Sequence, residues 1–252
     1  MTPNIFTFVS KKLENSDYKS KDFDKLKAIV GEADKNAISH ETKPGEHSPS
    51  VSNNNRGETA FQRALYDHSE GQIQLGRVVW CDIELPVTFS NKSRRRCIDL
   101  IGRLESCGNF LCELKYAKSK KSASSNGPDY AVIEALLYYG LVEKNQKELD
   151  TYEVWRDERK AKFYWADVAK SRTFMVLAND SFWEKAQRIP AASKRIFELV
   201  NSIQSELKIR VLLCKTTDFE FKKGVANDPK RYCPQLPNGA DKWETVRFEV
   251  AC

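Results

Sequence analysis

The stretch NFLCELKYAK, residues 109–118, determines the centre of the predicted fold. Alternate apolar positions are typical of a buried strand: Phe110, Cys112, Leu114 and Tyr116. Glu113 and Lys115 stand two residues apart between them, and strand side chains alternate between faces. We therefore expect a strand with one dry face and a second face that presents an acid and a base side by side.

The segments around this strand predict a mixed sheet. A helix at 58–68 and β-rich segments at 77–89 and 96–104 precede it, with short polar turns that favour an antiparallel meander. An apolar stretch at 129–145 predicts a buried helix after it. The order so far is helix, three strands, helix.

Two more apolar segments, 172–180 and 208–215, predict buried strands separated by helical sequence, which is typical of a parallel crossover. Segments 218–223 and 244–252 predict extra C-terminal strands. The predicted fold class is α/β, with a mixed central sheet flanked by helices.

The chain divides at a polar stretch. Residues 35–57 are poor in apolar side chains and indicate a flexible linker, preceded by a short amphipathic helix at 20–34. We expect an N-terminal segment at 1–57 and an α/β domain at 58–252.

Composition sets broad limits on function. The 252 residues carry a formal net charge of +6, which permits a nucleic-acid partner without requiring one. Seven cysteines without a C-x-x-C pair and three histidines argue against a zinc site and favour free thiols in a reducing compartment. A secretory leader and an apolar run of about 20 residues are both missing, so we expect a soluble, cytoplasmic protein without membrane contact.

Asp99 gives the charged pair a third member. It lies inside the apolar segment IDLIG, fourteen residues before Glu113, so a hairpin would bring the two carboxylates together. Facing carboxylates repel each other and are costly to bury, and a divalent cation removes that conflict. Mg²⁺ takes such oxygen ligands, and Lys115 beside it could orient a water or stabilise phosphate charge. The pattern predicts metal-assisted hydrolysis of a phosphodiester.

The spacing D-(x)13-E-x-K, with a helix before it and a buried helix after it, resembles the PD-(D/E)XK nuclease superfamily; the resemblance covers roughly residues 58–144, with a looser match through residue 215. The resemblance implies a restriction-endonuclease-like αβββαβ core and a nuclease that uses Mg²⁺ or Mn²⁺. It implies that Asp99 and Glu113 bind the metal, that the carbonyl of Leu114 is a further ligand, and that Lys115 is the motif lysine.

Other motif positions agree in part. Many members carry a glutamate on the first helix, for which Glu58 is preferred here and Glu84 is the alternative. A Q-x-x-x-Y element of several lineages corresponds to Glu134 and Tyr138, with Glu in place of Gln. Ile98 stands where the motif proline would be.

Basic runs flank the motif, and they are predicted to hold a nucleic-acid backbone without reading its sequence: Arg94, Arg95, Arg96, Lys118, Lys120 and Lys121. Solvated turns are the alternative interpretation of these runs. The resemblance favours DNA over RNA, and cutting of both strands would favour a homodimer.

Two competing hypotheses remain. A nuclease-like fold without catalytic activity could serve as a nucleic-acid or protein binding module, although the intact Asp99, Glu113 and Lys115 argue for an enzyme. An unrelated α/β protein could match the motif by accident, in which case Asp99 and Glu113 would lie far apart.

Overall fold

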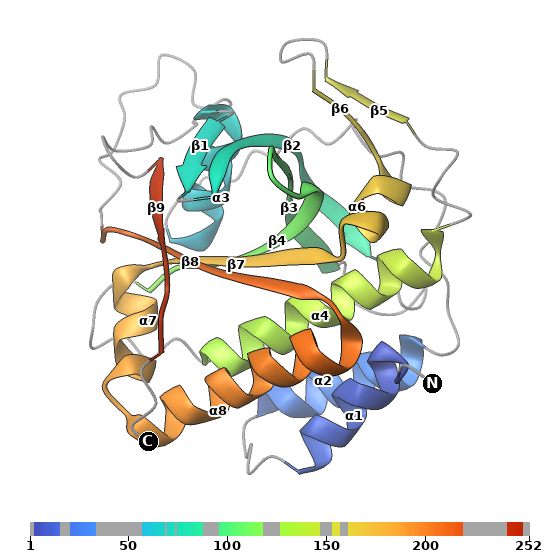
Figure 1. Ribbon diagram of the computed structural model, residues 1–252, viewed down its shortest axis with the longest axis vertical. Helices are drawn as coiled ribbons and strands as arrows, with labels where there is room; N and C mark the ends of the chain where they lie inside the picture. The colour runs from blue at the N-terminus through green and yellow to red at the C-terminus, as the bar shows by residue number, and fades with distance from the viewer. Residues whose placement is uncertain are drawn as a thin grey trace.

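The computed structural model describes residues 3–15, 21–33, 57–68, 70–73, 75–87, 96–117, 127–146, 153–156, 161–218 and 241–248. The fold is α/β, with a mixed, curled sheet flanked by helices (Figure 1). The predicted fold class is confirmed at this level.

The described helices are α1 (Ile5–Glu14), α2 (Lys21–Ala33), α3 (Glu58–His68), α4 (Pro128–Lys144), α6 (Trp165–Ser171), α7 (Asp180–Gln187), α8 (Pro190–Ser202) and the π-helical turn η2 (Ile203–Leu207). The described strands are β1 (Glu70–Ile73), β2 (Gly76–Val87), β3 (Arg96–Leu104), β4 (Gly108–Lys115), β5 (Glu153–Arg156), β6 (Ala161–Tyr164), β7 (Thr173–Asn179), β8 (Arg210–Thr216) and β9 (Lys242–Thr245).

The main sheet has the strand order β1-β2-β3-β4-β7-β8-β9 and closes where β9 pairs with β1. Strands β2, β3 and β4 form the predicted antiparallel meander, and β7 and β8 pair in parallel as predicted. Strand β4 also pairs in parallel with β7. Strand β9 adds an antiparallel C-terminal strand to β8, but it shares only Glu244 and Thr245 with the predicted strand at 244–252, because residues 246–248 are not in a strand and residues 249–252 lie outside the described residues. Residues 219–223 of the other predicted C-terminal strand lie outside the described residues.

Strand β1 and the separate β5-β6 hairpin were not predicted. Each of these strands has four residues, too few to show a clear alternation. The hairpin also lies in the charged segment between α4 and β7, where the apolar pattern is weak.

The centre of the sheet is buried on both faces. All seven residues of β7 and all but the first residue of β4 are buried, so these strands read as nearly continuous apolar runs. Figure 1 shows α4, α8, α1 and α2 on one side of β7 and β8, and α3 with β1 and β2 on the other. The all-round apolar sequence of α4 therefore reflects its place between the sheet and other helices.

The N-terminal helices share the core of α4. The buried residues of α1 and α2 belong to the same apolar cluster, and α2 confirms the predicted helix at 20–34. Gly140 allows close approach of α1, because a Cβ there would lie 2.8 Å from Cγ2 of Ile5. Residues 35–56 of the predicted linker lie outside the described residues.

Two further observations concern the chain as a whole. No helix among the described residues is long and apolar enough to cross a membrane. The five cysteines of the described segments are free thiols, and three of them are buried in the sheet: Cys81, Cys112 and Cys214.

Candidate active site

Lys115 ends strand β4 and is only 8% exposed. Its ammonium contacts carboxylates from three different elements. It donates a short hydrogen bond to Glu113 on its own strand, lies 3.2 Å from Oε2 of Glu134 on α4, and lies 3.8 Å from Oε1 of Glu58 on α3. Residues distant in the sequence thus meet around one buried positive charge.

The strand pattern explains why Glu113 and Lys115 point toward α4. Leu111, two residues earlier on the same face, belongs to the core cluster that contains α4. Cys112 and Leu114 belong to the cluster on the opposite face. The predicted charged face of β4 therefore exists, and α4 covers it.

Asp99 reaches this group from β3. The hairpin register pairs Leu100 with Cys112, so Asp99 lies beside the next residues of β4. The backbone N–H of Leu114 donates to Oδ2 of Asp99 over 2.8 Å, and the side chain of Gln62 donates to Oδ1 over 3.1 Å. The structure thus brings Asp99, Glu113, Lys115, Glu58 and Glu134 together, and we call these five residues the carboxylate–lysine cluster.

Glu58 and Glu84, the two candidates for the further acid of the motif, lie in different places. Glu58 opens α3, is 43% exposed at its side chain and reaches Lys115. Glu84 on β2 instead forms an ion pair with Arg63 at 3.8 Å. Geometry therefore favours Glu58 over Glu84 as a member of the cluster.

Burial dominates the electrostatics of the acids. Burial raises the pKa of Asp99 to about 8, against the opposing effects of Lys115 and the Leu114 N–H. Burial, together with the charge of Glu134, raises the pKa of Glu113 well above its usual range. Asp99 therefore holds a proton for much of the time at neutral pH.

Lys115 responds in the opposite way. Burial alone would lower the pKa of its ammonium, but the surrounding acids Glu113, Glu134, Glu58 and Asp99 together raise it well above its usual range. Lys115 is therefore a permanent cation at any ordinary pH. The cluster contains four carboxyl groups and one ammonium, so its net charge is negative whenever more than one of the four acids is ionised.

Two buried oxygens of this cluster have no hydrogen-bond partner, Oε2 of Glu113 and Oε2 of Glu134, although the latter lies 3.2 Å from the Lys115 ammonium. Oε2 of Glu113 is buried and accepts no hydrogen bond, although the other oxygen of the same carboxylate accepts from Lys115. An unpaired buried acceptor is costly, so such an oxygen needs an explanation. A cation at this oxygen would remove the cost.

The donor chemistry suits Mg²⁺ or Mn²⁺, which prefer carboxylate oxygens. Among the residues that the structure describes, however, no three His, Cys, Asp or Glu side chains form a group that could hold a metal ion. Mg²⁺ is commonly bound through one or two carboxylates, with waters and substrate phosphates as its other ligands. The cluster fits that sparse type of site and not a closed protein cage.

Sequence reasoning missed Gln62. It lies one helical turn after Glu58, so E-x-x-x-Q at 58–62 places both side chains on one face of α3. That spacing is the sequence signal from which a role for Gln62 beside Glu58 could have been predicted. Glu134, which was noted only as a departure from the Q-x-x-x-Y element, is a direct partner of Lys115, and Tyr138 donates to its other oxygen over 3.4 Å.

The basic residues predicted to bind nucleic acid are mostly beyond what the structure describes. Arg96 is the first residue of β3. The others lie outside the described residues: Arg94, Arg95, Lys118, Lys120 and Lys121. For Leu114, the structure gives a role to the backbone N–H, and the predicted role of its carbonyl stays a prediction.

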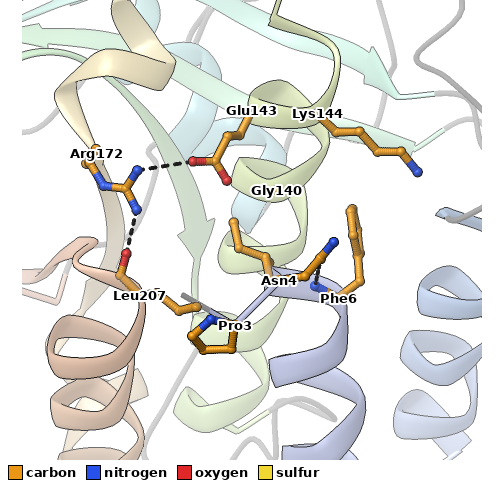
Figure 2. Close-up of a pocket in the computed structure, with 9 residues that line it drawn as sticks. Pro3, Asn4, Phe6, Gly140, Glu143, Lys144, Arg172 and Leu207 are labelled. Carbon is orange, nitrogen blue, oxygen red and sulfur yellow. Dashed lines mark hydrogen bonds and ion pairs between the residues drawn. The ribbon is translucent and has the colours of Figure 1, made fainter. Parts of the chain in front are cut away.

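A pocket of about 360 Å³ lies elsewhere, between the start of α1, the end of α4 and the end of η2 (Figure 2). None of its lining residues belongs to the carboxylate–lysine cluster. The guanidinium of Arg172, which lines the pocket, donates hydrogen bonds to the backbone carbonyl of Leu207 and to the carboxylate of Glu143, as Figure 2 shows. The pocket is therefore a weaker candidate for a catalytic site than the carboxylate–lysine cluster.

Comparison of the chain with protein-family models, curated proteins and solved structures finds no match in any of the three.

Proposed function

We propose that this protein is a metal-dependent nuclease of the PD-(D/E)XK type that hydrolyses phosphodiester bonds of nucleic acid, DNA in preference to RNA. The supporting observation is the meeting of Asp99, Glu113 and Glu58 around Lys115, with one buried carboxylate oxygen of Glu113 unpaired. Apart from the short strand β1, the β5-β6 hairpin and helix α6, the order is α3-β2-β3-β4-α4-β7 with β4 and β7 parallel, which also suits the proposed αβββαβ core.

Asp99 and Glu113 would hold Mg²⁺ or Mn²⁺, with Glu58 and the carbonyl of Leu114 as further oxygen donors. When bound, the ion would supply charge neutralisation at the phosphate and a more acidic water. The proposal needs no closed protein cage, because water and phosphate oxygens complete the coordination of such ions.

Lys115 has a defined role in this proposal. An ammonium with a strongly raised pKa is a donor and a positive charge, and it does not accept a proton. It would therefore orient the attacking water by N–H donation or stabilise the charge that develops on a phosphate oxygen. Glu134, 3.2 Å away, would keep the ammonium charged and in place.

The flanking basic residues would hold the rest of the substrate. In the sequence, Arg94 and Arg95 directly precede Arg96, the first residue of β3, and Lys118, Lys120 and Lys121 follow within six residues of Lys115, the last residue of β4. Strands β3 and β4 carry Asp99 and Glu113, so both runs are connected directly to the strands of the cluster. Their contacts would be to phosphates, and cutting of both strands would favour a homodimer.

Cleavage assays test the proposal. The parent protein is incubated with supercoiled DNA, single-stranded DNA and RNA, in Mg²⁺, Mn²⁺ or EDTA. We expect metal-dependent cleavage that Asp99→Asn and Glu113→Gln abolish and that Glu143→Gln, an acid beside Arg172, leaves unchanged. A parent that cuts none of these substrates, or an Asp99→Asn variant that cuts at the parent rate, refutes the proposal.

One observation favours the alternative of an inactive binding module. Lys115 already provides a cation to Glu113, and the described residues contain no group of three acids that could hold a metal. Calorimetric titration with Mg²⁺ separates the two functions. The nuclease requires Mg²⁺ binding that Asp99→Asn removes, and the module would bind nucleic acid without any such Mg²⁺ binding.

A further inference from the structure

Gln62 is a buried glutamine, 5% exposed, whose amide nitrogen donates two hydrogen bonds to the same residue, Asp99. Its Nε2 donates to the backbone carbonyl of Asp99 over 2.9 Å and to Oδ1 of the same residue over 3.1 Å. A backbone carbonyl can only accept, so the amide nitrogen must face Asp99. The chemistry of the acceptors thus fixes the orientation of the amide.

These contacts lock the carboxylate of Asp99. Gln62 bridges the main chain and Oδ1 of Asp99, which fixes the side-chain torsion, and the N–H of Leu114 holds Oδ2. When Asp99 is ionised, each of its carboxylate oxygens has a second lone pair that these bonds leave available. Asp99 is therefore oriented on both oxygens while it keeps acceptor capacity for a cation.

The chemical nature of the donor matters here. A lysine or arginine at position 62 would bring a positive charge that competes with a metal ion, and a glutamate would repel Asp99. An amide supplies two N–H donors without charge. Because Gln62 lies one turn after Glu58, α3 presents a charged group and a neutral donor to the same cluster.

We propose that Gln62 is a positioning residue, which holds the Asp99 carboxylate in the orientation that binds the catalytic cation. This inference rests on the proposed nuclease function. Partners that orient a metal ligand contribute about 10–100-fold to metal affinity or activity. Loss of the Gln62 donors should therefore weaken Mg²⁺ binding within that range and lower kcat, while KM for DNA stays close to that of the parent.

The test uses the full chain and Mg²⁺ alone as the calorimetric probe. Gln62→Met removes both donors at nearly constant volume, and Gln62→Asn keeps an amide that is one methylene too short. The control is Gln187→Met on α7, an exposed glutamine whose amide donates to the carbonyl of Arg247 over 3.2 Å. Both Gln62 variants should weaken the Kd for Mg²⁺ by about 10–100-fold, and the control should not.

Three results overturn the inference in distinguishable ways. Parent-like Mg²⁺ affinity in a folded Gln62→Met or Gln62→Asn variant overturns the positioning role alone. A loss of thermal stability with unchanged Mg²⁺ affinity assigns Gln62 a structural role instead. A parent that neither binds Mg²⁺ nor cuts nucleic acid overturns the nuclease proposal and this inference together.

Discussion

Replacement of Lys115 should damage the protein far more than replacement of its partner Glu113. In Lys115→Met the ammonium disappears, so Glu113 and Glu134 lose the cation that stabilises their ionised forms. In Glu113→Gln, by contrast, the ammonium keeps Glu134 at 3.2 Å and Glu58 at 3.8 Å. The asymmetry follows from the excess of acid in the cluster.

The magnitude follows from the burial of the pair. Lys115 and Glu113 are 8% and 3% exposed, and removal of one partner from a buried ion pair typically costs about 3–5 kcal/mol because the other charge is left uncompensated. We expect Lys115→Met to lose about 3–5 kcal/mol at neutral pH without metal. Glu113→Gln leaves no uncompensated cation and reduces the acid excess, so its loss should stay below about 1.5 kcal/mol, the size of one ordinary hydrogen bond.

Urea unfolding followed by tryptophan fluorescence measures both losses, since the chain has five tryptophans and Trp80 and Trp183 are fully buried. The measurement is made in EDTA and repeated with saturating Mg²⁺. If the carboxylates bind the ion, Mg²⁺ should restore more stability to Lys115→Met than to the parent. Equal losses for Lys115→Met and Glu113→Gln in EDTA would show that the reasoning about excess acid is wrong.

Two further predictions concern pH and packing. Because the pKa of Asp99 is raised to about 8 in the folded protein and is about 3.9 in the unfolded chain, the folded state holds the extra proton between these values. Its contribution to stability is therefore greatest below about pH 4 and falls as pH rises toward 8, by up to about 1.4 kcal/mol per pH unit. Glu113 and Glu58, whose pKa values are also raised by burial, add to the same fall. Asp99→Asn should therefore reduce the slope of urea midpoints measured from pH 5 to 8 without abolishing it, and a parent-like slope would refute the assignment. Gly140→Ala should lower the free energy of unfolding by about 1–3 kcal/mol, because its Cβ would lie 2.8 Å from Ile5. The control is Gly31→Ala in α2, where no atom lies within 4 Å of the new Cβ, and thermal unfolding should show no change or a gain of up to about 1 kcal/mol. Similar effects at the two glycines would contradict the close approach of α1 to α4.

The sequence predicted the central elements well because their apolar patterns are strong. Strands β2, β3 and β4 alternate or run apolar over eight or more residues, and α4 is apolar nearly all round. The same pattern placed Glu113 and Lys115 on one face, and the hairpin spacing brought Asp99 to them. These predictions depend on local periodicity, which a single sequence displays.

Other features depend on tertiary contacts that no local pattern displays. Closure of the sheet rests on two residue pairs between β1 and β9, which are far apart in the chain. The role of Gln62 requires knowledge that α3 lies against β3, and the role of Glu134 requires α4 to cover the charged face of β4. Helix α1 was not predicted, although Asn4 caps its first turn by accepting from the N–H of Phe6.

The balance of charge in the carboxylate–lysine cluster bears on why such a cluster exists at all. Buried ion pairs contribute little net stability, and apolar residues of similar volume often serve as well or better. This cluster is less favourable than a balanced pair, because four acids share one ammonium and an oxygen of Glu113 stays unpaired. A cluster selected for stability would have equal charges and satisfied oxygens, whereas a cluster that accepts a cation and a phosphate must keep acceptors unsatisfied until they arrive. The acid excess around Lys115 thus supports the proposed site, because strongly perturbed acids concentrate at functional sites.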